Sequence, residues 1–125
     1  MTVVDACVVI SFLAGEATPE VEMLAALLSS AEAIVAPSTV TELLSDPSGG
    51  RGLAPLIDHF QTIEIGEGYW ARAGQLRASV RRAGRKAALG DALLAQACLD
   101  ADLPLLTSDR DFKVFTQLSK LRLAS

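Results

Sequence analysis

The chain has 125 residues, of which half are hydrophobic and 21% are charged, and its net charge is −4. This composition excludes a disordered chain and provides enough apolar surface for one compact domain, residues 1–125. The acidic balance also excludes a protein that binds nucleic acid simply through a general excess of positive charge.

Cysteine content and the first apolar run bear on the compartment. Cys7 and Cys98 are the two cysteines, and both lie in apolar surroundings. They suit a reducing environment rather than a disulfide framework. The first apolar run contains Asp5 and ends at Gly15, so it is a poor signal peptide and falls short of the roughly 20 residues that cross a bilayer. We therefore expect a cytoplasmic protein without membrane contact.

The first predicted element is a strand at "TVVDACVVI", residues 2–10. It is rich in β-branched residues and apolar on both alternations, which is typical of a central strand covered on both faces. The cluster "PSGGRG", residues 47–52, is expected to be the most flexible point. In chain order, the remaining predictions are a helix at 20–31, a strand at 33–37, helices at 38–46 and 53–60, a strand at 61–66, helices at 68–84 and 90–103, a strand at 104–109, a helix at 110–121 and an edge strand at 121–124.

Strands thus alternate with helices along the whole chain. This pattern predicts an α/β fold with right-handed crossovers, in which a central, mostly parallel sheet carries helices on both faces. In such sheets, functional sites form beyond the carboxyl ends of the strands. We expect a site at that edge.

Several acidic residues fall where strand ends and helix starts are predicted to meet: Asp5, Glu42, Asp91, Asp109 and Asp111. All except Asp5 also have a structural explanation. Glu42 has capping-box spacing from Thr39, Asp91 suits a first helical turn, and Asp109 can brace a turn. Asp5 has none, because a strand interior offers no capping role, and we interpret it as functional.

Grouped carboxylates need a counter-charge. Two of them about 4 Å apart repel by roughly 4 kcal/mol at an effective dielectric constant near 20. Protons, basic side chains or divalent cations can relieve that repulsion, and a ligand set made only of oxygen suits Mg²⁺ or Mn²⁺. The only histidine, His59, lies away from every acidic motif.

Four motifs in register resemble the PIN-domain family of metal-dependent ribonucleases. They are "VVDACVVI", "TELL", "GDALLAQAC" and "LLTSDRDF", and together they span nearly the whole chain. The chain is similar in its short form to the VapC-type toxin of a VapBC toxin–antitoxin pair. This resemblance implies the PIN-like three-layer fold and an Mg²⁺- or Mn²⁺-dependent endoribonuclease, with RNA as substrate, a VapB-like antitoxin as partner and a homodimer as the assembly.

The resemblance also implies roles for individual residues. Catalytic residues carried over are Asp5, Glu42, Asp91 and Asp109, with Asp5, Asp91 and Asp109 as metal ligands. Thr107 and Asp111 are implied as supporting residues, and the choice between Asp109 and Asp111 as the last ligand stays open. Many relatives have serine where this chain has Cys7, so a hydroxyl contact near the first aspartate is replaced by a weaker thiol donor.

The helix predicted at 68–84 and the turn after it concentrate positive charge. Such charge can bind phosphates, although a solvated helix face is the alternative explanation. The candidate RNA-binding residues are those nearest Asp91: Arg82, Arg85 and Lys86.

Three other functions remain open. A PIN-like module that binds RNA or a partner with little catalysis is compatible with Cys7. A Mg²⁺-dependent phosphotransfer domain would also place an aspartate at a strand end, but the chain lacks the expected second acid. A nucleotide-binding Rossmann domain fits the fold class only, because no glycine-rich loop follows the first strand.

Overall fold

The computed structural model describes residues 1–47, 50 and 52–124. Its centre is a sheet of four parallel strands in the order β3-β2-β1-β4. The strands are β1 (Thr2–Val4), β2 (Ala33–Val35), β3 (Gln61–Thr62) and β4 (Leu105–Leu106). The predicted α/β class with a parallel sheet is thus confirmed.

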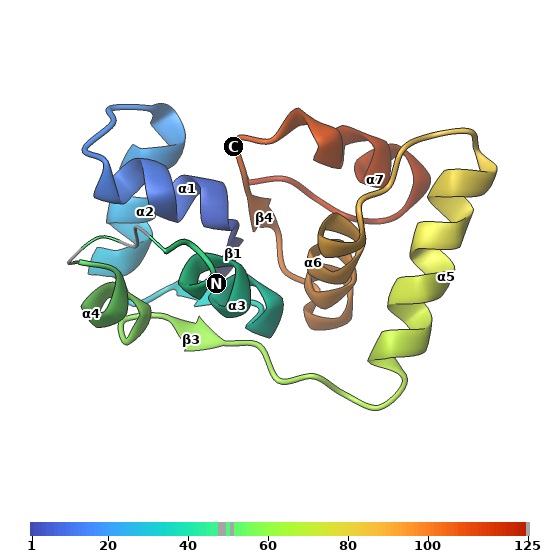
Figure 1. The fold of residues 1–125 in the computed structure, drawn as a ribbon, viewed down its shortest axis with the longest axis horizontal. Helices are drawn as coiled ribbons and strands as arrows, with labels where there is room; N and C mark the ends of the chain where they lie inside the picture. Colours follow the sequence, from blue (N-terminus) through green and yellow to red (C-terminus); the bar gives the residue numbers. More distant parts are fainter. Residues whose placement is uncertain (48–49, 51, 125) are drawn as a thin grey trace.

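Helices cover both faces of this sheet (Figure 1). One layer contains α1, α2 and α4, and the other contains α5, α6 and α7. The bounds are α1 (Ala6–Leu13), α2 (Pro19–Ser29), α3 (Pro37–Leu44), α4 (Leu53–Ile57), α5 (Tyr69–Arg82), α6 (Leu89–Ala101) and α7 (Lys113–Leu118), with a 3₁₀ turn, η1 (Arg110–Phe112), before α7. Helix α3 contacts both α1 and α6.

Neighbouring residues of the central strands feed two separate cores. Val3 and Leu105 pack with residues of α5, α6 and α7, whereas Val4 and Leu106 pack with residues of α1, α2 and α4. All four side chains are buried. Because successive strand residues point to opposite faces, an apolar residue at every position is what a sheet covered on both sides requires.

The strand predicted at residues 2–10 is wrong beyond its first few residues. β1 ends at Val4, and helix α1 begins at Ala6. Asp5 lies between them as the N-cap, and its carboxylate accepts a hydrogen bond from the Ala6 N–H at 2.8 Å. The β-branched run resembled a strand because its buried face and β1 are both apolar, and the capping preference of aspartate was overlooked. Asp5 therefore does have a structural role.

Two further expectations differ from the structure or lie beyond it. The edge strand predicted at 121–124 is reduced to one parallel bridge between Leu105 and Leu123. In the predicted flexible cluster, Ser48, Gly49 and Arg51 lie outside the described residues.

Helices α5 and α6 pack along each other, and polar side chains in the first turn of α5 bond to α6. Arg72 forms an ion pair with Asp100 at 2.6 Å, and the Tyr69 hydroxyl donates to the Leu93 carbonyl at 2.6 Å. The Arg72 guanidinium lowers the pKa of Asp100 below its usual value. Arg77 donates to the Ala87 carbonyl at 2.9 Å. Two cations of the basic helix thus serve the fold.

Helix α5 ends in a glycine-dependent turn. Gly84 has φ of +75°, its N–H donates to the Arg81 carbonyl at 2.9 Å, and the Arg85 N–H donates to the Val80 carbonyl at 3.2 Å. This pair of bonds is the Schellman motif, which favours glycine at the left-handed position. The turn directs Arg85 and Lys86 towards the start of α6.

Among the helices of the described residues, none combines the length and hydropathy needed to cross a membrane.

Candidate active site

The candidate site lies beyond the carboxyl ends of β1, β2 and β4. Asp5 follows β1 directly, α3 with Glu42 begins two residues after β2, and Asp109 follows β4 by three residues. Asp91 is in the first turn of α6. Since parallel strands end at the same edge, residues distant in the sequence meet there.

The Asp5 carboxylate accepts three hydrogen bonds, and the residue is only 7% exposed. One carboxylate oxygen accepts from the Ala6 N–H, and the other accepts from the Thr107 hydroxyl at 2.7 Å. The Cys7 thiol donates to that second oxygen at 3.4 Å, and the Ser108 hydroxyl donates to Cys7 Sγ at 3.3 Å. The thiol thus contacts the carboxylate directly. The distance of 3.4 Å between Sγ and Oδ2 and the weak donor character of a thiol make this a weak hydrogen bond.

Thr107 links the first strand to the last acidic turn. Its hydroxyl donates to Asp5 and accepts from the Asp109 N–H at 3.0 Å. Asp109 in turn caps η1, because its carboxylate accepts from the Asp111 N–H at 2.9 Å. The expected turn-bracing role of Asp109 is therefore present in the structure. One hydroxyl thus fixes the positions of both Asp5 and the 109–111 turn.

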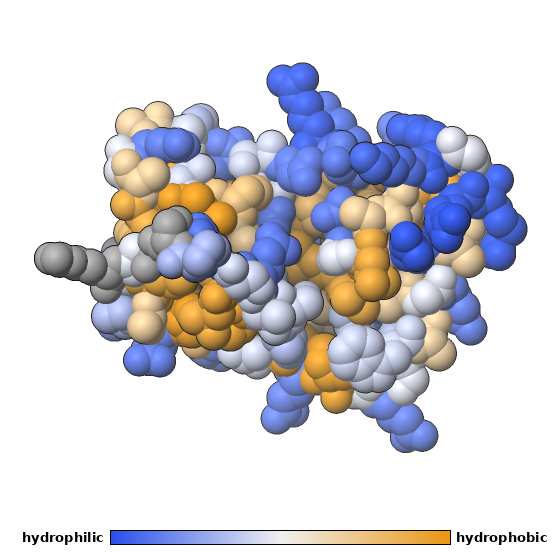
Figure 2. Space-filling view, in the orientation of Figure 1, coloured by the Kyte–Doolittle hydropathy of each residue, from blue (hydrophilic) through white to orange (hydrophobic). Residues whose placement is uncertain are grey.

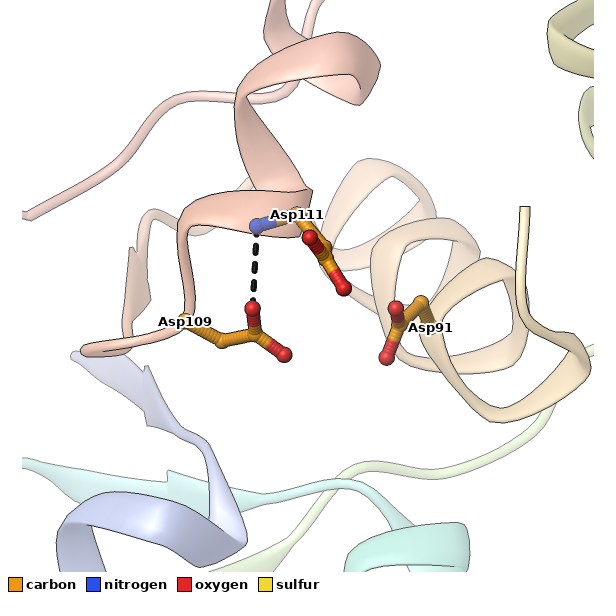
Figure 3. Close-up of side chains that lie close together, drawn as sticks. All are labelled: Asp91, Asp109 and Asp111. Atoms are coloured by element: carbon orange, nitrogen blue, oxygen red, sulfur yellow. Dashed lines mark hydrogen bonds between the residues drawn. The ribbon is translucent and has the colours of Figure 1, made fainter. Parts of the chain in front are cut away.

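Three carboxylates form the group best placed to hold a metal ion: Asp91, Asp109 and Asp111. One oxygen from each lies within 4.8 Å of the others. Figure 3 shows Asp91 on α6 facing the two aspartates of the η1 turn. These donors are hard oxygens of negative charge at one point, which fits Mg²⁺ or Mn²⁺ by ligand type.

The electrostatics of Asp91 reflect this crowding. Burial and then the charges of Asp109, Asp5, Asp111 and Glu42 raise the pKa of Asp91 to about 6. Asp91 therefore senses the charge of every other acidic residue predicted for the site. Negative charge accumulates here without an ion pair to any described cation.

Glu42 lies at the edge of the group. Its side chain is exposed on α3, and burial followed by the charge of Asp5 raises its pKa. Helix α3 begins at Pro37 with Ala36 as its N-cap, so Thr39 is inside the helix and the capping-box explanation for Glu42 does not apply.

Of the acids predicted as metal ligands, Asp91 and Asp109 belong to the close group. Asp5 is outside it, and Asp111, predicted as a supporting residue, is inside it. The sequence left the choice between Asp109 and Asp111 open, and the η1 turn brings both to the same point because one caps the other's amide.

Positive charge borders the acids. Arg85 and Lys86 line a cavity that Asp91 and Asp111 also line, whereas Arg82 is exposed at the end of α5 and does not line it. The same cavity contains Arg110 and Lys113, which the sequence reasoning did not single out. Arg110 lies within the last acidic motif, and Lys113 follows Arg110 by three residues. This spacing, which puts the two on one side of a helical turn, was the available signal.

Comparison with known protein families identifies the family of this chain. The profile of the PIN domain matches residues 2–118. The chain belongs to the PIN domain family. No curated protein matches the sequence significantly.

Solved structures share the fold of this PIN domain across nearly its whole length. VapBC2 from Rickettsia felis, bound to a DNA fragment from its promoter, has a TM-score of 0.78 at 14% identity and covers 98% of this chain and 96% of that one. VapBC-1 from nontypeable Haemophilus influenzae has a TM-score of 0.74 at 18% identity, with 94% of each chain covered. FitAcB from Neisseria gonorrhoeae has a TM-score of 0.71 at 18% identity and covers 100% of this chain and 97% of that one.

Proposed function

We propose that this PIN domain is a metal-dependent endoribonuclease and the toxin of a type II toxin–antitoxin pair. The observation that carries the proposal is the meeting of Asp91, Asp109 and Asp111 at the carboxyl edge of the parallel sheet in a PIN domain. Membership of the family supports a nuclease, and the fold shared with VapBC structures supports a VapC-type toxin.

The three clustered aspartates would hold Mg²⁺ or Mn²⁺. When bound, such an ion supplies an activated water and stabilises charge on the phosphate and the leaving oxygen. Asp5 stands beside this group with its orientation fixed by Thr107, and it is suited to accept a hydrogen bond from a water or to complete the ligand set. Glu42, with its raised pKa, is the candidate for exchanging a proton with that water.

RNA is the proposed substrate, with hydrolysis leaving a 5′-phosphate and a 3′-hydroxyl. Neutralisation of the acids is what would let an acidic protein accept an anionic strand at this edge. Arg85 and Lys86 border the acids and supply positive charge for the RNA strand.

An antitoxin and a second copy of the chain are the proposed protein partners. Ile10 and Leu13 on α1 and Leu44 on α3 are 50%, 37% and 60% exposed. Figure 2 shows hydrophobic surface in the left half of the molecule, where Figure 1 has α1, α3 and α4. Exposed apolar patches of this kind mark protein interfaces, and we assign this one to an apolar segment of a VapB-like antitoxin.

Cleavage of structured RNA by the purified protein tests the activity. Wild type, Asp91→Asn, Asp5→Asn and the exposed control Glu16→Gln are incubated with RNA in Mg²⁺ or Mn²⁺ and in EDTA. We expect wild type and Glu16→Gln to cleave, and the aspartate variants and the EDTA sample to lose at least 100-fold in rate, the order of loss typical of a removed catalytic group. Equal cleavage by all four proteins would refute the assigned site.

Sequencing of the RNA ends identifies the chemistry. A 5′-phosphate at each new end supports hydrolysis by a water molecule, and a 5′-hydroxyl contradicts it.

The antitoxin is tested by co-purification of the protein with the product of a small adjacent gene. RNA cleavage should appear when that product is removed.

Cys7 supports one second candidate function. Its thiol is a weak donor to Asp5 Oδ2 at 3.4 Å. A PIN domain that binds RNA or a partner with little cleavage would follow if this contact limits the site. In that case, Cys7→Ser should raise the cleavage rate above that of wild type, whereas an unchanged rate contradicts this second function.

A further inference from the structure

A cavity of about 310 Å³ adjoins the acidic group, and four of the residues that line it are cations. Asp91 and Asp111 are among its lining residues. The opposite sign comes from Arg85 and Lys86, in the connection between α5 and α6, and from Arg110 and Lys113, in η1 and α7. In Figure 2, strongly hydrophilic side chains gather at the upper right, where Figure 1 has the end of α5 and α7.

None of these four cations forms an ion pair in the described part of the chain. The ion pairs found there join Arg72 to Asp100 and Arg122 to Asp102, and none of these residues lines this cavity except Arg122 and its partners in a different one. No side-chain hydrogen bond occupies Arg85, Lys86, Arg110 or Lys113 either, since the bonds of the described residues involve other cations. Four unpaired cations from two separate segments therefore converge on one hollow.

The arrangement of charge is informative because the two signs are adjacent but do not pair. If the cations served to neutralise the aspartates, they would form ion pairs with them, and none does among the described residues. The aspartates remain available for a metal ion, and the cations remain available for an anion. A ligand that uses both features carries one anionic group whose oxygens can approach a metal ion at the aspartates. It also carries a second, neighbouring anionic group that reaches the cations.

The backbone of the fold sets the cations in place. The Schellman turn at Gly84 ends α5 and points the following residues at the start of α6. The η1 turn, capped by Asp109, places Arg110 and Lys113 beside Asp111. The same cap therefore positions an acid of the metal group and the cations of the cavity.

We propose that this cavity binds a backbone phosphate of the RNA strand, immediately next to the phosphate held at the acidic group. The inference rests on the proposed nuclease function and adds to it the direction in which the strand leaves the metal site. A phosphate is preferred to the carboxylates of an acidic peptide because successive phosphates on one strand engage the metal group and the cavity together. Arginine and lysine are the usual donors to phosphate.

Salt dependence of RNA binding tests the proposal directly. A labelled single-stranded RNA is titrated by fluorescence anisotropy at several salt concentrations in constant Mg²⁺. Every protein carries Asp5→Asn, which retains a good N-cap and prevents the proposed cleavage. The test protein adds Arg85→Gln and Lys113→Gln. The matched control adds Lys120→Gln and Arg122→Gln, which remove two positive charges at the other end of α6, where both residues line a different cavity.

We expect the test protein to bind RNA at least 10-fold more weakly at low salt. The slope of log affinity against log salt should become shallower by about 1.4, since each lost contact to a single strand contributes about 0.7. The control should keep the parent slope. Thermal unfolding midpoints within about 2 °C of the parent verify that the variants are folded.

Three results would overturn the proposal: an unchanged slope in the test protein, an equal loss in the control, or no RNA binding by the parent. A labelled oligoglutamate peptide run in parallel assigns the cavity to a protein partner if only its binding is lost. Cleavage by the protein without any of these substitutions is measured separately. Cleavage with an unchanged slope refutes the cavity alone, whereas a changed slope without cleavage refutes the nuclease and retains the cavity as an RNA-binding site.

Discussion

The Thr107 hydroxyl connects two acidic parts of the site through hydrogen bonds. It donates to Asp5 at 2.7 Å and accepts from the Asp109 N–H at 3.0 Å, so it orients one acid and anchors the turn that carries two others. A side chain of the same shape without the oxygen would leave the Asp109 N–H without this acceptor and the second Asp5 oxygen with only the weak Cys7 thiol as donor.

Thr107→Val is therefore expected to lower the free energy of unfolding by about 2 kcal/mol. It should also reduce the RNA cleavage rate by roughly 100-fold, because small displacements of catalytic groups are costly. Chemical denaturation and single-turnover cleavage measure the two effects. Thr107→Ser keeps the oxygen and should retain most of both, and a matching loss in the serine variant would mean that the methyl group is what matters.

The pKa of Asp91 makes stability depend on pH. Its folded value is about 6, above the ordinary 3.8. Between about pH 4 and pH 6 the folded protein keeps a proton that the unfolded chain has lost. Stability without metal should therefore fall as the pH rises through this window and be level above it.

Asp91→Asn removes this penalty. In EDTA at pH 7.5 the variant should unfold about 2–4 °C above wild type, which is a value discounted for the exposure of the side chain. At pH 4 the two proteins should unfold at nearly the same temperature. Glu16→Gln serves as the control, and a stabilisation that is the same at both pH values would contradict the shifted pKa.

At the scale of single residues, the structure brings the predicted acids to one edge of the sheet, but the reason given for Asp5 was wrong. Asp5 was interpreted as functional because a strand interior offers no cap, and in the structure it caps α1. Arg110 and Lys113 were overlooked because their importance depends on the fold of the η1 turn, which brings them beside residues 85 and 86.

Among the elements, the end of α5 shows most clearly how a backbone motif serves the site. Gly84 adopts φ of +75°, which a residue with a side chain tolerates poorly, and no atom within 4 Å obstructs a Cβ there. Any cost of substitution is thus conformational rather than steric.

Gly84→Ala should lower the free energy of unfolding by about 1 kcal/mol, the cost of placing alanine in the left-handed region. RNA affinity should fall as well, because Arg85 follows this turn directly. Denaturation and anisotropy measure the two. Gly74→Ala, in the interior of α5 with open space around its Cβ, is the control and should stabilise the protein slightly. Unchanged affinity in Gly84→Ala would separate the turn from RNA binding.

The order and type of most elements followed from the sequence, because largely apolar central strands and helices with an apolar stripe leave strong patterns. Boundaries were harder. The apolar run after Asp5 has the same residue types as β1, so composition could not separate strand from helix, and only the capping preference of aspartate marked the change. The edge strand predicted at 121–124 is reduced to a single bridge to Leu105, which leaves most of the segment outside the sheet.

For the molecule as a whole, the central feature is that charges of opposite sign are kept adjacent and unpaired. Repulsion within the acidic group weakens the metal-free fold, so a bound cation should act as a stabilising ligand. A ligand at 100 times its dissociation constant adds about 2.7 kcal/mol to the free energy of unfolding.

Mg²⁺ or Mn²⁺ at saturating concentration should therefore raise the unfolding temperature by roughly 10 °C. Asp109→Asn should lose most of this shift, and K⁺ at equal ionic strength should not produce it. Differential scanning calorimetry with and without EDTA gives the comparison. A shift of the same size in Asp109→Asn would locate the ion elsewhere.

The pairing of β1 with β4 has a consequence for synthesis of the protein. The aspartate at position 5 obtains its hydroxyl partner only from residue 107, and two of the three clustered acids follow that residue. A nascent chain still lacking these residues thus carries an incomplete centre. On the proposed function, the ribosome that makes the enzyme is exposed to its activity only after residue 111 has been translated and β4 has docked beside β1.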